Sequence, residues 1–96
     1  MIGFEWDPKK AKSNERKHKV SFEEAMSVFL DDDARIQDDP DHSIREDHFV
    51  LLGMSDTARV LTVVHCYRQS DTVIRIISAR KATRRERAIY GGYKNA

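Results

Sequence analysis

The sequence predicts a single α+β domain, in which an antiparallel β-meander of about four strands follows two helices and precedes a third. Signals for helix starts occur towards both ends of the chain, at Asp7, Ser21 and Thr83. Between them, apolar runs alternate with short turn sequences, a pattern typical of consecutive antiparallel strands. The 96 residues fit one domain, residues 1–96, and we expect its helices to pack on one face of the sheet.

The first helix is expected from about Pro8 to His18, after a short lead-in over residues 4–6. Asp7 is a suitable N-cap, and Pro8 takes the first helical position, where a missing N–H is not needed. A helical period of 3.6 residues places three side chains on one face of this helix: Ala11, Asn14 and His18.

The second helix is expected to begin at Ser21, because Ser21 and Glu24 have the spacing of a capping box. Val20 is placed to pack against Ala25 as a hydrophobic staple. The helix should end near Leu30, because the acidic run that follows would oppose the helix dipole at a C-terminus.

Four strands are expected next, at residues 34–37, 49–54, 59–68 and 72–80, with Arg45 as an alternative, earlier start of the second. Turn residues separate them at 38–41, 55–57 and 69–71. A last helix should follow a second capping box, Thr83 to Glu86, and end at Gly91-Gly92. Its apolar stripe contains Ala82, Ile89, Tyr90 and Tyr93, together with Glu86.

Composition excludes several classes of protein. Charged residues make up 34% of the chain, yet the apolar runs are clear, which favours a folded domain over a disordered one. The longest apolar stretch, Val60 to Val64, is far too short to span a membrane, and the N-terminus lacks the pattern of an export signal. Cys66 is the single cysteine, which fits a reducing cytoplasm.

The net charge of +1 conceals an uneven distribution. Residues 1–20 carry +3, residues 21–58 carry −9, and residues 59–96 carry +7. If the segments stay apart after folding, the basic end would attract phosphate and the acidic middle could recruit a basic partner. The alternative is that the segments pair with one another.

Several motifs resemble those of the BrnT toxins, in the same order and over nearly the whole chain. In the N-terminal half these are residues 4–7, Asn14, the pair Lys17-His18, and residues 20–25. In the C-terminal half they are residues 53–55, 63–65 and 75–80, then Ala82-Thr83, Glu86-Arg87 and Tyr90.

This resemblance implies a small ribonuclease with a RelE-like α+β fold, acting as the toxin of a type II toxin–antitoxin system. It also implies a BrnA-like antitoxin, a DNA-binding protein whose dimer would hold two toxins inactive. Two positions depart from the pattern of the family: Lys19 stands where a helix-ending glycine is usual, and His48 stands where an arginine precedes the strand at 49–54.

Ribonuclease chemistry of this kind needs no metal or other cofactor. The 2′-hydroxyl of RNA attacks the adjacent phosphorus, and the protein supplies a base, an acid and positive charge for the phosphate. Arginine suits the last task, because its guanidinium fork matches phosphate oxygens. We therefore expect Arg75 and Arg80 to contact phosphate. Alternation along a strand places them on opposite faces unless the strand twists, bulges or ends, and either could instead pair with Glu86 or Glu46.

His65 and Glu46 are the candidates for proton transfer. An ordinary pKa of about 6.5 suits His65 to acid or base work, although a histidine in a half-buried sheet can serve only as a hydrogen-bond donor. Glu46 is the acidic residue expected near the basic strands, or else a solvated one. We expect His18 to close a contact between a helix and the sheet.

A surrounding surface for RNA would use side chains that track the phosphates or stack on bases. Core packing, a solvated surface or antitoxin contact are the alternative roles of these side chains. Metal binding is not expected, because the histidines and aspartates at 38–48 lack the spacing of metal ligands. The expected RNA-binding residues are Arg59, Arg68, Tyr67, Arg84 and His48.

Two other functions agree with the sequence. The basic surface could serve only to bind the antitoxin or a nucleic acid, without catalysis. Alternatively, the changes at Lys19 and His48 could mark a toxin that has lost its activity.

Overall fold

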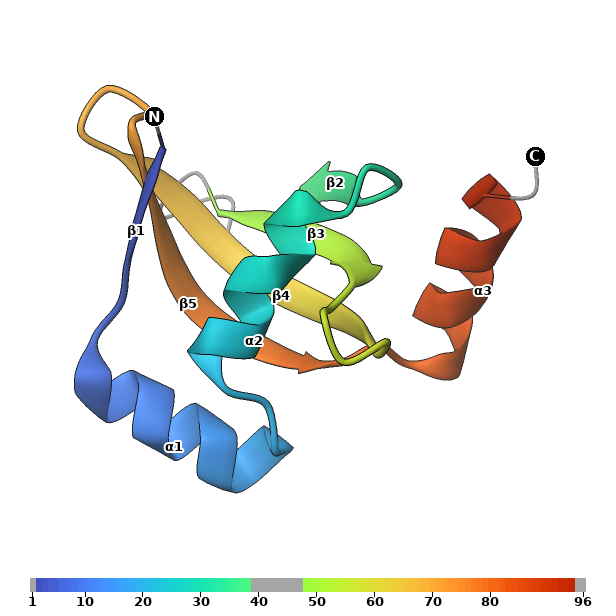
Figure 1. Cartoon of the computed structure of the whole chain (residues 1–96), viewed down its shortest axis with the longest axis horizontal. Coiled ribbons are helices and arrows are strands. Elements are labelled where there is room, and N and C mark those ends of the chain that lie inside the picture. Colours follow the sequence, from blue (N-terminus) through green and yellow to red (C-terminus); the bar gives the residue numbers. More distant parts are fainter. Residues whose placement is uncertain (1, 39–47, 95–96) are drawn as a thin grey trace.

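The computed structural model describes residues 2–38 and 48–94. The chain begins with strand β1 (Gly3–Glu5), helix α1 (Pro8–His18) and helix α2 (Phe22–Ser27), which continues as the 3₁₀ helix η1 (Val28–Leu30). Four strands follow, β2 (Arg35–Asp38), β3 (Phe49–Met54), β4 (Val60–Arg68) and β5 (Val73–Lys81), before helix α3 (Arg84–Lys94) (Figure 1). The predicted order of helices and later strands is confirmed. The predicted turn at 38–41 and the early start at Arg45 fall largely or wholly outside the described residues.

The sheet has five strands in the order β1-β5-β4-β3-β2, and it is mixed. Strands β2 to β5 form the predicted antiparallel meander. The prediction that residues 4–6 form only a lead-in to the first helix is wrong. Gly3–Glu5 is a strand that pairs in parallel with residues 73–75 of β5. Three residues are too few to show a periodic pattern, so only the pairing with a distant strand defines this element.

The helix starts lie where the sequence placed them. Asp7 accepts a hydrogen bond from the Lys9 N–H, and the Ser21 hydroxyl accepts one from the Glu24 N–H. Thr83 and Glu86 form both bonds of a capping box. Helix α3 runs on to Lys94 and does not end at Gly91-Gly92, since neither glycine adopts a positive φ.

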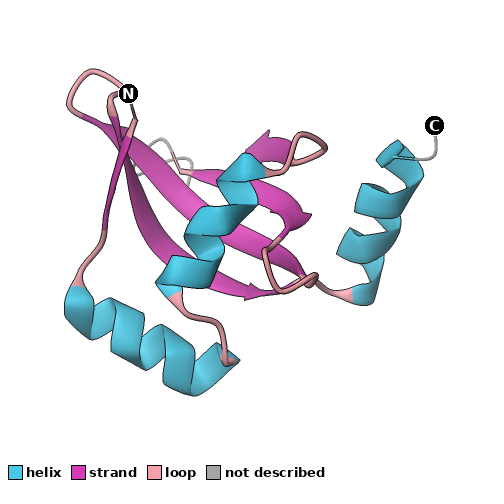
Figure 2. Ribbon diagram, viewed as in Figure 1, coloured by secondary structure: helices cyan, strands magenta, loops and turns pink. Residues whose placement is uncertain are grey.

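The main core lies between the sheet and the helices α1 and α2, which cover the same face (Figure 2). Val20, Phe22, Ala25 and Val28 are fully buried there. The strands contribute the other buried side chains of this core: Leu51, Leu61, Val63, Ile74, Ile76 and Ala79. We call this side of the sheet the helix face.

Helix α3 does not join that layer, so the expectation of all helices on one face was wrong. Tyr90 and Ala82 pack against Leu52, whose neighbour Leu51 points into the main core. Successive strand residues point to opposite faces, so α3 belongs to the other side of the sheet. The helix lies beyond the strand ends in Figure 1. Within the described residues, no helix is long and apolar enough to cross a membrane.

Candidate functional site

A β-bulge in β5 brings the two predicted phosphate-binding arginines to one face. The register shifts between the pairs Val64–Ser78 and His65–Ile76, which leaves Ile77 without a partner on β4. Arg75 therefore lies opposite Cys66, and Arg80 lies opposite Thr62. These two partners are four residues apart on β4 and point to the same side, away from the helix face.

We call this side the arginine face. It carries Arg75 and Arg80 of β5 and Arg68 at the end of β4. Arg35 also belongs to it, because Arg35 pairs with Leu52, which in turn pairs with Thr62. Sequence reasoning did not single out Arg35, since its orientation depends on a register that the sequence does not display.

Arg80 is held by Glu86 of α3. Its two terminal nitrogens donate to the two carboxylate oxygens at 2.7 and 3.0 Å, and the carboxylate also accepts from the Thr62 hydroxyl and the Thr83 N–H. Hydrogen bonds from Arg80, opposed by partial burial, lower the pKa of Glu86 to about 2 from 4.5. The alternative salt bridge between Arg80 and Glu86 is thus present, although 41% of the Arg80 side chain stays exposed.

Arg75 is paired in the same way with a carboxylate of this chain. Its Nη1 donates to Glu5 at 2.8 Å, across the β1–β5 pairing that sets the two residues side by side. Each side chain remains 34% exposed. Arg75 uses one nitrogen in this contact, so other N–H groups of the guanidinium are available for phosphate.

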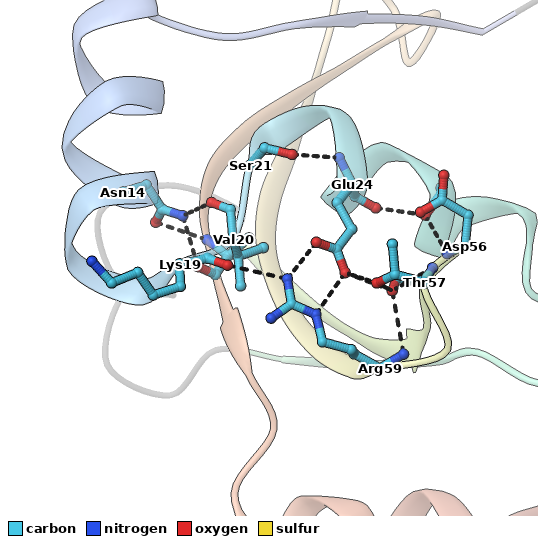
Figure 3. A network of polar contacts seen from close by, with 11 residues as sticks. Asn14, Lys19, Val20, Ser21, Glu24, Asp56, Thr57 and Arg59 are labelled. Atoms are coloured by element: carbon cyan, nitrogen blue, oxygen red, sulfur yellow. Dashed lines mark hydrogen bonds and ion pairs between the residues drawn. The ribbon is translucent and has the colours of Figure 1, made fainter.

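Arg59 has a structural role. Its Nε donates to Glu24 Oε2 at 2.9 Å, a terminal nitrogen binds the other carboxylate oxygen, and the same group donates to the Lys19 carbonyl (Figure 3). The hydroxyls of Ser55 and Thr57 also donate to Glu24. These contacts, with Arg59 foremost and opposed by partial burial, lower the pKa of Glu24 to about 2. The residue thus fastens the β3–β4 turn to α2.

His65 does not meet the arginines. It is fully buried on the helix face, in edge-to-face contact with Phe29 and Tyr67, whose ring centroids lie 4.9 and 5.4 Å away. Burial lowers its pKa, so the ring is neutral at pH 7, and its Nε2 has no hydrogen-bond partner. His65 therefore lies on the opposite side of the sheet from Arg75 and Arg80, and its role in proton transfer stays a prediction.

The other predicted residues are dispersed. Tyr67 lies half-buried on the helix face against Phe49, with ring centroids 5.5 Å apart, so it packs within the protein. Arg84 is exposed on α3, and His48 is half-buried just before β3. Glu46 lies outside the described residues. No cluster of three potential metal ligands occurs within residues 2–38 and 48–94.

Asn14 is a residue whose importance the sequence only hinted at. Its amide donates to the carbonyls of Val20 and Ala79 at 3.0 and 2.8 Å, and its oxygen accepts from the Ala79 N–H at 3.1 Å. On the edge opposite β4, strand β5 has no neighbouring strand at Ala79, since β1 pairs only with residues 73–75. Asn14 thus satisfies the open edge of β5 and fixes α1 against it.

A groove of about 220 Å³ lies between α1 and β5, and Asn14 is among its lining residues. His18 lines it together with Ile77 and Ser78, as expected for a contact between helix and sheet. The side chains of Lys10, Ser13 and Lys17 line the helix side.

A second, apolar groove of about 410 Å³ crosses the outer side of α2. Phe4, Met26 and Leu30 line it, and 84% of Leu30 is exposed. Glu23 and Asp56 add negative charge, and no basic residue is part of the lining.

Comparison with known proteins identifies relatives of this arrangement. The sequence model of a family described as the ribonuclease toxin BrnT of type II toxin–antitoxin systems matches residues 6–86. The crystal structure of the Brucella abortus ribonuclease toxin BrnT superposes with a TM-score of 0.69 at 20% identity, covering 88% of this chain and 100% of the other. No curated protein sequence matches the chain.

Proposed function

The chain belongs to the BrnT family of ribonuclease toxins of type II toxin–antitoxin systems, and on that premise we propose that it is an endoribonuclease that cleaves RNA without a metal ion. The match over residues 6–86 carries this proposal. It includes the bulged strand β5 and Glu86, hence both arginines of the arginine face. A RelE-like relationship of the fold and action in the cytoplasm are part of the proposal.

The arginine face supports a role in phosphate binding. The bulge at Ile77 directs Arg75 and Arg80 to the same side of the sheet, and Glu5 and Glu86 hold the two guanidiniums in place. A positive group that is already positioned stabilises the charge of a pentavalent phosphate without reorganising during the reaction. Arg68 would extend this surface. Glu46 stays a prediction as the base.

Cleavage in the presence of a chelator tests the proposal. The chain, purified without a partner, should cut a labelled RNA in EDTA, and it should leave a 2′,3′-cyclic phosphate, because the nucleophile is the 2′-hydroxyl of the substrate. An RNA with 2′-O-methyl groups should stay intact. Gel electrophoresis followed by mass spectrometry of the 3′ ends measures both results.

The double variant Arg75→Gln/Arg80→Gln, purified identically, excludes a contaminating nuclease. It should reduce the cleavage rate at least a hundredfold, in line with the loss of about 3 kcal/mol for a single preorganised donor. Intact RNA with the wild-type chain would contradict the enzyme, and cleavage that EDTA abolishes would contradict the metal-free mechanism.

A non-enzymatic binding module is the second candidate. One observation favours it: Arg59, Arg75 and Arg80 are each paired with a carboxylate of this same chain. Such pairs reduce the positive potential that is available to an RNA phosphate. Wild-type chain that binds RNA but leaves it uncut would select this function.

We further propose that a BrnA-like antitoxin neutralises the chain, with two toxins per antitoxin dimer, and that any contact with DNA occurs through the antitoxin. The apolar groove over α2 suits a partner segment that combines apolar and basic side chains, because Glu23 and Asp56 flank Met26 and Leu30. Acidic residues at this groove would repel RNA, so the surface is available to a protein partner.

Leu30→Glu should weaken the binding of the antitoxin more than tenfold, because it places a charge in the middle of the apolar contact. The probe is the product of the neighbouring reading frame, titrated by calorimetry. Ile2→Glu is the matched control, since Ile2 is also exposed, at 53%, and does not line the groove. Equal affinities of the two variants would remove the groove from the interface.

A further inference from the structure

The groove between α1 and β5 has an electrostatic character unlike that of the arginine face. Lys10 and Lys17 line it, both are exposed, and neither forms an ion pair with any described residue. No carboxylate is among the lining residues. By contrast, Arg75 and Arg80 each share their charge with a glutamate. Lys10 and Lys17 therefore place positive charge along this groove that no ion pair with a described residue compensates.

The spacing of the groove residues suits an extended chain of phosphates. Lys10, Ser13 and Lys17 follow one another at intervals of three and four, so they lie on one stripe of α1. The helical rise of 1.5 Å per residue separates the two lysines by about 10 Å along the axis. The hydroxyls of Ser13 and Ser78 on opposite walls can donate to phosphate oxygens between the lysines.

The groove and the arginine face have Ser78 in common. Ser78 lines it, and Ser78 pairs with Val64 on the same side of the sheet as Arg80, two residues further along. Asn14 also lines the groove, and its two hydrogen bonds with Ala79 fasten α1 to the edge of β5. A single-stranded nucleic acid that leaves the arginine face at Ser78 would therefore reach the groove with Lys10 and Lys17.

We propose that this groove binds the sugar–phosphate backbone of single-stranded RNA next to the cleavage site, with Lys10 and Lys17 as its two phosphate contacts. The identity of the ligand as RNA rests on the proposed function. The contacts reach no base, so the groove contributes affinity and orientation without sequence preference. Lys10 and Lys17 are binding residues, and they take no part in the reaction itself.

A salt titration of RNA affinity tests the groove separately from catalysis. The probe is a fluorescein-labelled oligonucleotide of about 20 nucleotides with 2′-O-methyl groups throughout, and fluorescence anisotropy gives its Kd at several KCl concentrations. Each phosphate contact on a single strand contributes about 0.7 to the slope of log affinity against log salt. The double variant Lys10→Gln/Lys17→Gln should therefore lower the magnitude of that slope by about 1.4.

Lys9→Gln/Lys12→Gln is the matched control. It removes the same charge from exposed positions of the same helix that do not line the groove. This control should change the slope by less than half as much. Equal slopes for the two double variants would contradict the proposal that the groove binds RNA. A loss of antitoxin affinity in Lys10→Gln/Lys17→Gln with RNA binding unchanged would contradict it as well.

Failure of the groove and failure of the enzyme are distinguishable. If the wild type cleaves RNA and the slopes are equal, the groove does not bind RNA but the proposed nuclease activity stands. A selective fall in slope without any cleavage by the wild type would support the groove and overturn the nuclease. The lysine side chains at 9, 10, 12 and 17 are exposed, so the variants should fold, which thermal unfolding verifies.

Discussion

Individual arginines of this chain are anchored by glutamates before any ligand arrives. The sequence indicated that an arginine in an apolar strand needs an anion, and the structure supplies that anion internally for Arg59, Arg75 and Arg80. The pairs with Glu24 and Glu86 are the better shielded, with only 10% and 23% of those glutamate side chains exposed. Their strength appears in the pKa of both carboxyls, which falls to about 2.

The pH dependence of stability follows from those values. Between pH 4.5 and 2 the unfolded chain binds protons at Glu24 that the folded chain does not, so acid favours unfolding. The contribution of Glu24 is complete above about pH 5 and disappears as the pH approaches 2. Glu24→Gln should lower the free energy of unfolding at pH 7 by roughly 2 kcal/mol, and its stability should fall less steeply below pH 5.

Urea unfolding that is followed by circular dichroism from pH 7 to pH 2.5 measures this effect. Glu23→Gln removes the same charge one residue earlier from an exposed site, and its acid limb should run parallel to that of the wild type. If the free energy of unfolding falls equally steeply below pH 5 in Glu24→Gln and in the wild type, the pair of Glu24 with Arg59 contributes no net stability.

Elements are defined here by their ends and irregularities more than by their interiors. The interiors of α1, β3 and β4 lie close to their predicted ranges because the period of the apolar residues determines them. The departures are the parallel strand β1, the bulge at Ile77 and the end of α3. Each depends on a pairing partner or on a backbone conformation that a pattern of residue types does not specify.

The end of α1 offers a direct test of such a conformation. Lys19 closes the helix at φ 61° and ψ 32°, in the left-handed region where a side chain is strained. Lys19 thus adopts the left-handed conformation that the helix-ending glycine usual at this position would adopt with less strain. Lys19→Gly should raise the free energy of unfolding by about 0.5–1 kcal/mol, because the N–H to Glu15 and the carbonyl to Arg59 are both kept.

Lys12→Gly is the opposite control, since a glycine inside an exposed helix should lower the free energy of unfolding by about 1 kcal/mol. Chemical denaturation of both variants measures the two changes in the free energy of unfolding, which should have opposite signs. A Lys19→Gly protein that is less stable than the wild type would mean that the side chain of Lys19, whose Nζ reaches the Arg16 carbonyl, outweighs the strain.

The surfaces of the molecule differ in charge and in whether helices cover them. Helices α1 and α2 cover one side of the sheet and the arginine face lies on the other, whereas the groove with Lys10 and Lys17 lies between α1 and β5. The acidic apolar groove over α2 lies on the outside of the helix layer. This arrangement agrees with the uneven charge along the sequence, because the basic and acidic segments meet in specific ion pairs and otherwise present distinct surfaces.

The sequence by itself determined the family, the α+β class, the helix starts and most strand ranges, since motif order, capping residues and apolar periodicity are all local properties. Only the tertiary structure decided the site. It placed His65 on the side of the sheet opposite the arginines, turned Arg75 to the side of Arg80 through one unpaired residue, and gave Arg75 a carboxylate partner 70 residues away in the chain. Contacts over such separations depend on strand register, and register is a property of two segments that neither one encodes alone.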